Sequence, residues 1–318
     1  ITQTIYNTNT NTYESVNTNA GFNIGGFVGT YDGFPSNQGI DTATSSGNVS
    51  YTGVLTGLTN SGSYLNLGGF VGSSRGHITN VTSSGAVLLT VDATVNSGYN
   101  AGGFAGTSAN YATGPNTFVT AILENITSTN NFTENQITSG ITVNSYQNTG
   151  GFIGFNISTI QNVSYSGVVM LTLDIFDSSS SNIGGFVGFN ERDGNNLTTN
   201  LGMITNATNN SVLIYQQAVN GLQTNANLTI GGFVGGNRGE IDQVAVIGPS
   251  TNNPITITTD VSGNSTINAG GFAGANYTSS GLPAGEIKNA ISNSAITIDQ
   301  VNSDYNAAGL NVGGFIGN

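Results

Sequence analysis

Apolar residues along this chain recur in three fixed settings, and Asn, Ser, Thr and Gly fill most of the positions between them. The first setting is a phenylalanine flanked by glycines. The second is an aliphatic residue with Asn or Asp one or two positions later, and the third is a further apolar residue. The third follows the second by nine positions in six of seven cases, and Gly248-Pro249-Ser250 marks a loop insertion in the exception. This recurrence indicates a repeat architecture, in which each unit buries its apolar face against the next.

Three sets of anchors follow from this pattern. The glycine-flanked phenylalanines are Phe27, Phe70, Phe104, Phe152, Phe186, Phe233, Phe272 and Phe315. The second anchors are Ile40, Ile78, Leu123, Ile160, Ile204, Ile241 and Ile287. The third anchors are Val49, Val87, Phe132, Val169, Leu213, Ile255 and Ile296.

The spacing between anchors alternates between long and short. From each phenylalanine to its second anchor the separations are 13, 8, 19, 8, 18, 8 and 15 residues. From each third anchor to the next phenylalanine they are 21, 17, 20, 17, 20, 17 and 19 residues. Strands in neighbouring coils lie about 4.8 Å apart, so long loops on every coil would crowd one another, whereas loops on alternate coils have room. Inheritance from a duplicated pair of coils explains the alternation equally well.

The residues around the anchors are typical of strands. Residues 86–91 and 168–173 are short apolar runs, each preceded by glycine, and no window shows a helical period with caps. We therefore predict an all-β chain that forms a parallel β-helix, or β-solenoid. It should have about seven to eight coils, roughly three strands per coil, and long and short coils in alternation.

The anchors also divide the chain into two segments. Residues 23–318 are predicted to form the solenoid domain, and residues 1–22 precede the first anchor as an N-terminal arm or cap. Residues 2–6 alternate in the manner of a strand. The arm is interpreted either as a cap over the first coil or as a strand that pairs with another subunit.

The glycines around each phenylalanine have a packing explanation. Without a side chain, the backbone can turn sharply, neighbouring coils can approach closely, and a positive φ is tolerated. Each ring should then point inward and stack on the rings above and below, and burial stabilises the fold by roughly 1.5–3 kcal/mol per ring. We interpret the eight phenylalanines as a structural core ladder. An aromatic row that binds a ligand is the less favoured alternative.

Charge argues against several classes of partner. The formal net charge is −12, and the basic residues are Arg75, Arg192, Arg238 and Lys288. Nucleic acids and anionic membranes both require clustered Lys and Arg, so we expect neither partner. No apolar run is long enough to span a membrane, which argues against insertion. A composition poor in Lys and rich in Asn, Thr and Gly favours an exported protein at the cell surface.

Residues 68–72, followed by residues 76–81, resemble the GLUG motif, a short glycine-flanked hydrophobic repeat. Residues 150–163 and 231–244 match nearly as well, and the resemblance extends over residues 23–318. Similar repeats occur in bacterial surface adhesins, in filamentous-haemagglutinin-like proteins and in non-catalytic parts of some secreted peptidases. The resemblance implies a β-solenoid with an extracellular structural or adhesive role. The long insertions after Phe104 and Phe186 depart from the motif, because they lack its Gly-x-Ile step.

The residues that catalysis needs are not gathered at one place in the sequence. Carbohydrate-cleaving β-helices use clustered carboxylates, or a cation with a base, whereas the 16 acidic residues here are scattered. The closest aspartate pairs are Asp174 with Asp177 and Asp299 with Asp304, which are interpreted as solvated loop acids, with weak Ca²⁺ binding left open. The single histidine, His77, is interpreted as a turn residue. We predict no enzymatic activity and no cofactor.

The candidate glycosylation sites are Asn80, Asn125, Asn162 and Asn206, each of which begins an Asn-x-Ser/Thr sequon just after a second anchor. The total number of sequons is close to that expected by chance in a chain so rich in Asn, Ser and Thr. Asn at this position also suits a turn or a ladder of stacked amides. The sequence therefore leaves glycosylation open beside a structural role.

Two function classes remain. The end coil of a solenoid exposes unpaired backbone, and residues 315–318 open a further coil. The first class is an extracellular structural subunit of a fibre or matrix that assembles head to tail with itself. The second is a cell-surface adhesin that binds a glycan or a host protein through long loops, especially residues 107–122 and 189–203. The first class is slightly favoured.

Overall fold

The computed structural model shows a chain built from β-strands. The residues it describes are 2–7, 12–17, 22–33, 39–56, 64–94, 96–114, 117–138, 140–142, 144–176, 178–192, 202–217, 222–223, 225–246, 254–259, 265–278, 285–300 and 309–318. Within these ranges all regular secondary structure consists of β-strands, and nearly all of the strands belong to one stack of coils.

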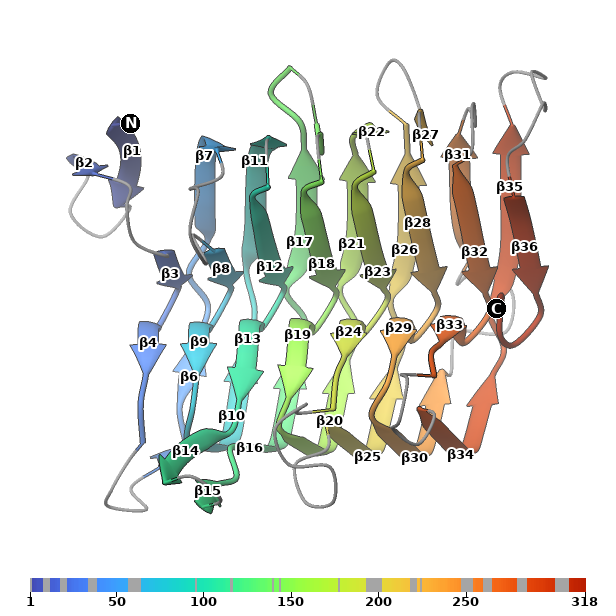
Figure 1. Ribbon diagram of the computed structural model, residues 1–318. Coiled ribbons are helices and arrows are strands. Elements are labelled where there is room, and N and C mark those ends of the chain that lie inside the picture. The colour runs from blue at the N-terminus through green and yellow to red at the C-terminus, as the bar shows by residue number, and fades with distance from the viewer. Residues whose placement is uncertain are drawn as a thin grey trace.

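Each coil passes through four walls in the same order (Figure 1). The chain runs along the first wall, turns at the Gly-Gly-Phe corner into the second, crosses to the third and returns along the fourth. Strands of successive coils pair in parallel, so every wall is a parallel sheet that extends along the solenoid axis. We name the walls sheets I to IV in this order.

The four sheets have these strands. Sheet I contains β3 (Phe22–Gly25), β8 (Tyr64–Gly68), β12 (Gly98–Gly102), β18 (Tyr146–Gly150), β23 (Ser180–Gly184), β28 (Asn227–Gly231), β32 (Thr266–Gly270) and β36 (Gly309–Gly313). Sheet II contains β4 (Val28–Tyr31), β9 (Val71–Ser74), β13 (Ala105–Ala109), β19 (Ile153–Ile157), β24 (Val187–Asn190), β29 (Val234–Asn237) and β33 (Ala273–Asn276). Sheet III contains β5 (Ile40–Asp41), β6 (Thr44–Ser45), β10 (His77–Ser83), β16 (Ile122–Ser128), β20 (Thr159–Tyr165), β25 (Met203–Asn209), β30 (Glu240–Val246) and β34 (Glu286–Ser292). Sheet IV contains β7 (Val49–Thr56), β11 (Ala86–Thr94), β17 (Asn131–Asn135), β21 (Val168–Thr172), β26 (Val212–Gln216), β31 (Pro254–Thr259) and β35 (Ala295–Gln300).

Three small pairs lie outside the walls. In the N-terminal arm, β1 (Thr2–Asn7) and β2 (Thr12–Asn17) pair antiparallel with each other. Strands β14 (Tyr111–Gly114) and β15 (Thr117–Val119) form a second antiparallel pair. Strand β22 (Ile175–Phe176) pairs in parallel with β27 (Leu222–Gln223) where the chain passes from sheet IV to sheet I.

The predicted all-β solenoid is confirmed, with eight strands in sheet I and seven in sheet II. Each coil has four main strands, one more than expected. Three anchors suggested three strands, but the Gly-Gly-Phe segment is a corner with a strand on either side of it. Strand β12 ends at Gly102 and β13 begins at Ala105. A corner of this kind contributes one apolar position to the sequence while it separates two walls.

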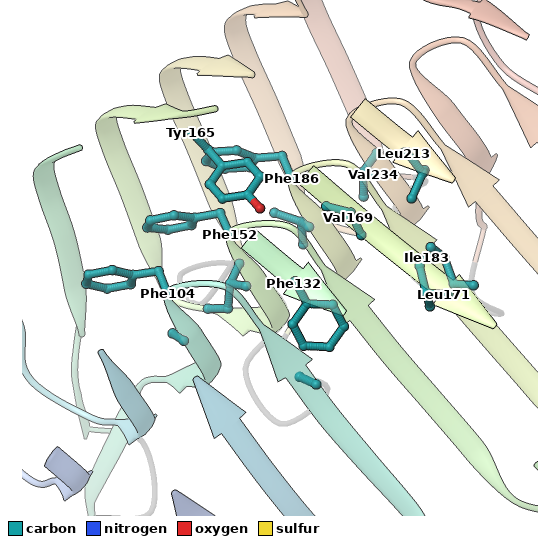
Figure 2. Close-up of a cluster of buried hydrophobic side chains, with 14 of the residues drawn as sticks. Phe104, Phe132, Phe152, Tyr165, Val169, Leu171, Ile183, Phe186, Leu213 and Val234 are labelled. Carbon is teal, nitrogen blue, oxygen red and sulfur yellow. The ribbon is translucent and has the colours of Figure 1, made fainter. Parts of the chain in front are cut away.

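The second and third anchors lie in register on the inner faces of sheets III and IV. Leu123 pairs with Ile78 and Ile160 of the neighbouring coils. The insertion before Ile255 does not disturb the register, because this residue still pairs with Leu213. Together with the phenylalanines, these side chains fill one continuous core (Figure 2).

Close backbone contacts explain the glycines of the corner. A Cβ atom on Gly102 would collide with the carbonyl oxygen of Ala105 in the same coil, and one on Gly103 would collide with that of Gly151 in the next coil. The third glycine, Gly106, lies against the backbone of β8 in sheet I. None of the three has a positive φ. Lack of space therefore requires glycine here, and the conformational freedom of glycine does not.

Long connections between sheets II and III occur on alternate coils. Strands β9 and β10 are joined by Arg75 and Gly76 alone, whereas the next connection, from β13 to β16, contains the pair β14–β15. Strands β19 and β20 are again joined by a single residue, Ser158. The β14–β15 pair projects from the lower edge of the solenoid in Figure 1. In the predicted binding loop 189–203, residues 193–201 lie outside the described ranges.

Candidate functional site

The eight glycine-flanked phenylalanines form one stacked column inside the solenoid, and Figure 2 shows part of it. Successive ring centroids lie 4.7–5.1 Å apart, with the rings nearly parallel. The six inner rings are fully buried, whereas Phe27 and Phe315 at the two ends are 52% and 36% exposed. The column stabilises the stack of coils, and its buried rings are inaccessible to a ligand.

Asn80, Asn125, Asn162 and Asn206 lie on the exposed outer face of sheet III. Their φ angles are 49–55°, in the left-handed region that Asn tolerates better than most residues. The amide of Asn125 donates to Asn80 over 3.2 Å, and that of Asn206 donates to Asn162 over 2.6 Å. The four residues therefore have a structural role in the backbone of sheet III, and their glycosylation stays a prediction.

The other residues with candidate chemistry do not meet in the structure. His77 hydrogen-bonds through its ring to a backbone carbonyl at the corner between sheets II and III. Asp174 is fully buried, so its interpretation as a solvated loop acid is wrong, whereas Asp299 is exposed on sheet IV. Their expected neighbours, Asp177 and Asp304, lie outside the described residues. The described part of the chain has no group of three or more His, Cys, Asp or Glu side chains suited to a metal ion.

A cavity of about 410 Å³ opens on the outer side of the corner between sheets I and II. Three asparagines form part of its lining, and they belong to a longer ladder of amides along sheet I. Each amide nitrogen in this ladder donates to the amide oxygen of the preceding coil over 2.8–3.0 Å. We call this set the groove ladder, and it contains Asn23, Asn66, Asn100, Asn148 and Asn182.

Strand alternation and the tight corner explain why these amides are recessed. Tyr99 and Ala101 of β12 point into the core and are fully buried, so Asn100 between them points outward. Sheet II folds closely over this outer face, because Gly106 has no side chain to hold it away from β8. Asn100 is consequently only 8% exposed although it lies on the outside of the wall.

Sheet II forms the opposite side of the cavity, which we call the corner groove. Three residues at one register position line it, Ser73, Thr107 and Phe155. Its remaining lining residues are Arg75, Ala109 and Tyr146. The guanidinium of Arg75 lies 4.0 Å from the carboxylate of Asp32, and both side chains are about half exposed. The groove thus presents amides, hydroxyls, aromatic rings and a single cation.

An aromatic cluster occupies the same corner in the later coils. Phe189 stacks on Phe155 with ring centroids 6.1 Å apart, and Tyr277 lies 6.0 Å from Phe189. The guanidinium of Arg238 lies 5.4 Å and 5.5 Å from the centroids of Phe189 and Tyr277. The hydroxyl of Tyr277 is 3.3 Å from that of Thr229, which replaces asparagine at this position of sheet I. The open groove therefore ends where these rings begin.

A second asparagine ladder lies inside the solenoid at the end of sheet II. Asn156 donates to Asn190, Asn190 to Asn237, and Asn237 to Asn276, over 2.8–2.9 Å. The first three residues are fully buried. Asn190 also donates to the carbonyl oxygen of Gly202 over 2.9 Å. This inner ladder holds the turn that leads from sheet II to sheet III.

One carboxyl group is buried in the core. Glu134 lies on the inner face of β17, two positions after Phe132, in a column that leucine occupies in both neighbouring coils. Its carboxylate accepts hydrogen bonds from Tyr99, from Gln147 over 2.8 Å and from Thr149 over 3.0 Å. Burial raises the pKa of Glu134 to about 7, although these hydrogen bonds oppose the rise.

Among the described residues, the arrangement suits binding better than catalysis. A hydrolytic site needs carboxylates, or a base, beside a position that substrate can reach. Glu134 is enclosed in the core, and the corner groove presents amides, hydroxyls and rings around Arg75. No helix among the described residues is long and apolar enough to cross a membrane.

Sequence reasoning missed both ladders and the buried acid, although each has a simple signal. Counting four positions back from each phenylalanine reaches Asn in every coil except the sixth, where it reaches Thr229. Counting four positions forward reaches the inner ladder in the last four of the seven complete coils. Glu134 follows the inward-facing Phe132 by two positions, so strand alternation turns it inward as well.

The resemblance of residues 23–318 to the GLUG repeat stays a prediction. Comparisons of this chain with family models, with curated proteins and with solved structures gave no match.

Proposed function

We propose that this chain is a non-catalytic extracellular structural protein whose solenoids stack end to end into a fibre or matrix. The support is the use of its side chains: the phenylalanine column and both asparagine ladders join each coil to the next. A stack of this kind is a stiff, quasi-one-dimensional body. The low content of charged residues, together with the GLUG resemblance, favours a location outside the cell.

The observation that carries the proposal is the likeness of the two outermost coils. Residues 23–29 and 311–317 both read Asn-x-Gly-Gly-Phe-x-Gly. Among the described strands, β3 pairs with β8 alone and β36 with β32 alone. Phe27 stacks on a ring on one side and Phe315 on the opposite side, which leaves each partly exposed. Such an edge accepts either another coil or the opposite edge of a second copy.

In the proposed contact, β36 of one copy pairs in parallel with β3 of the next. Phe315 then lies on Phe27, so the ring column continues across the junction, and the amide of Asn311 lies beside that of Asn23. The exposed Val312, 51% accessible at this edge, becomes covered. The contact is heterologous, and its repetition builds an open filament. The arm strands β1 and β2 pair with each other, so the contact is placed in β3.

A substitution at Gly314 tests the stacking contact without disturbing the fold of one copy. A Cβ atom there would meet no atom within 4 Å, whereas the equivalent Gly271 faces the carbonyl oxygen of Gly314 in the next coil. Gly314→Ala should therefore fold normally but clash with a stacked copy. We expect the wild-type chain to form unbranched fibres in electron micrographs, and we expect Gly314→Ala to lower the pelleted fibre mass by about tenfold or more.

Thr127→Ala is the control, because Thr127 lies on the exposed outer face of sheet III in β16 of a central coil, away from the proposed junction. This variant should form fibres as the wild type does. Monodisperse wild-type rods at every concentration would contradict the proposal, and so would fibres of Gly314→Ala in wild-type amounts.

The corner groove favours the second function class, an adhesin module that binds a surface ligand. Thr107 and Ala109, at the start of the predicted binding loop 107–122, line the groove, and the β14–β15 pair lies in the same loop. The two functions are compatible, because the groove is on the side of the stack and the junction is at its ends.

A further inference from the structure

The groove ladder leaves hydrogen-bonding capacity toward the cavity. Asn100 donates one N–H to Asn66 and accepts one hydrogen bond from Asn148. A carboxamide has two N–H donors and two acceptor lone pairs, so one donor and one acceptor per coil remain. Asn66, Asn100 and Asn148 all line the corner groove, and this pair of functions therefore repeats along it every 4.8 Å or so.

The rest of the lining makes the groove amphipathic and nearly uncharged. Ser73 and Thr107 contribute hydroxyls, and Phe155 contributes a partly exposed ring. Arg75 is the one charged lining residue, and Asp32 lies 4.0 Å from it. A neutral ligand with many hydroxyls and some apolar surface matches this lining. The cavity volume of about 410 Å³ lies within the range usual for ligand sites.

We infer that the corner groove binds an extended neutral saccharide chain that lies parallel to the solenoid axis. Sugar hydroxyls donate and accept hydrogen bonds, as the free groups of Asn66, Asn100 and Asn148 do, and the apolar face of a sugar ring packs on Phe155. A polymer of repeated units matches a repeated array of amides, whereas the side chains of a peptide vary along its length. Nucleic acid is disfavoured because the groove has a single cation.

The inference deepens the adhesin function and does not require end-to-end stacking. Ala109→Trp is the direct test, since Ala109 lines the groove without taking part in the ladder. The probes are linear hexasaccharides of glucose, mannose and N-acetylglucosamine, measured by calorimetry. We expect at least one to bind the wild type, and we expect Ala109→Trp to weaken that binding by about tenfold or more.

Two further variants complete the test. Thr127→Trp places the same side chain on the exposed outer face of sheet III and should leave the affinity unchanged. Phe155→Ala removes the ring and should also weaken binding, which keeps the test valid if Ala109→Trp fails to fold. Circular dichroism and thermal unfolding establish that each variant is folded.

The inference is overturned if no neutral hexasaccharide binds the wild type, or if folded Ala109→Trp and Phe155→Ala bind as the wild type does. Binding of polygalacturonate alone, lost in Arg75→Gln, would overturn the neutral class. Gly314→Ala should bind the saccharide as well as the wild type, so a failure of stacking and a failure of groove binding are distinguishable.

Discussion

The corner residues show how an absent side chain sets the distance between coils. Gly103 faces the carbonyl oxygen of Gly151 in the next coil, while Phe104 beside it stacks on Phe152 with ring centroids 4.8 Å apart. The backbone hydrogen bond from Phe104 N to Phe152 O, 2.9 Å long, crosses the same gap. A methyl group at Gly103 would separate the carbonyl, the ring and the hydrogen bond together.

Replacing Gly103 by Ala should therefore lower the free energy of unfolding by about 1–3 kcal/mol, because the new methyl group meets backbone that cannot rotate away. Gly47→Ala, with nothing within 4 Å, should raise it by about 0.5 kcal/mol by restricting the unfolded chain. Urea unfolding followed by circular dichroism measures both. Equal changes in the two variants would count against the steric explanation.

Glu134 makes stability depend on pH in an uncommon direction for a carboxyl group. Burial raises its pKa from 4.5 to about 7, so the folded state holds the proton more tightly than the unfolded chain does. The stabilisation of the folded state by Glu134 is fully present below pH 4.5. It is lost as the pH rises through about 7, and it changes no further above that pH.

Relative to Glu134→Gln, the wild type should thus lose up to about 3 kcal/mol of unfolding free energy between roughly pH 4.5 and pH 8. Gln keeps the volume and cannot ionise, so other titrating groups cancel in the comparison. Urea unfolding of both proteins across this range gives the difference directly. A difference that stays constant with pH would refute a raised pKa for Glu134.

At the scale of elements, the walls carry the fold and the long connections are additions to it. In sheet III, β16 pairs with β10 and β20 along its whole length, in spite of the long connection that precedes it. The β14–β15 pair hydrogen-bonds within itself. Residue Ala109 holds the place that Arg75 holds one coil earlier, and Ala121 holds that of Gly76.

Deleting residues 110–120 should therefore leave the solenoid intact. The deletion makes Ala109 and Ala121 consecutive, as Arg75 and Gly76 are in the preceding coil. The deletion removes two hydrogen bonds, one of 2.9 Å from the Ala121 amide to Asn110 and one of 3.1 Å between the His77 ring and the carbonyl oxygen of Thr120. We expect the thermal midpoint to fall by about 8 °C or less, as the loss of roughly 2 kcal/mol implies. Deleting β16 instead should abolish cooperative unfolding. If the loop deletion had that effect, the division into walls and additions would be wrong.

Over the whole molecule, every coil contacts its neighbours, so stability accumulates along the stack. The central anchors are fully buried, as Leu123 and Ile160 are, whereas Ile40 and Ile287 in the outer coils are only partly buried. The outermost coils each lack one neighbour among the described strands. They should open first.

Hydrogen exchange should follow this gradient. In the Gly314→Ala variant, whose copies do not stack in our proposal, the amide of Phe27 should exchange at least about tenfold faster than that of Phe152. Both amides donate to a phenylalanine carbonyl over 2.9 Å, so the comparison isolates position in the stack. Mass spectrometry of exchanged peptides provides the measurement. Uniform protection from end to end would show that the coils unfold as one unit.

The fold was largely predictable from particular residues, and the candidate site was not. The glycine-flanked phenylalanines and the anchors nine positions apart predict stacked coils, and those residues do lie in register. The fourth wall was not predicted, because the Gly-Gly-Phe corner has a strand on either side of it but only one apolar anchor in the sequence. The corner groove escaped because Asn100 and Thr107 are ordinary polar residues that acquire a role only when sheet II folds over sheet I.

By itself, the sequence determined the repeat, the parallel strands and the column of rings, because glycine and phenylalanine at fixed spacing permit little else. Only the tertiary structure decided which polar residues meet. The ladder partners Asn148 and Asn100 are 48 residues apart, and Asn182 and Asn148 are 34 apart. These separations differ because the loops differ in length. The amides meet only because backbone pairing holds successive coils in register whatever the length of the loop between them.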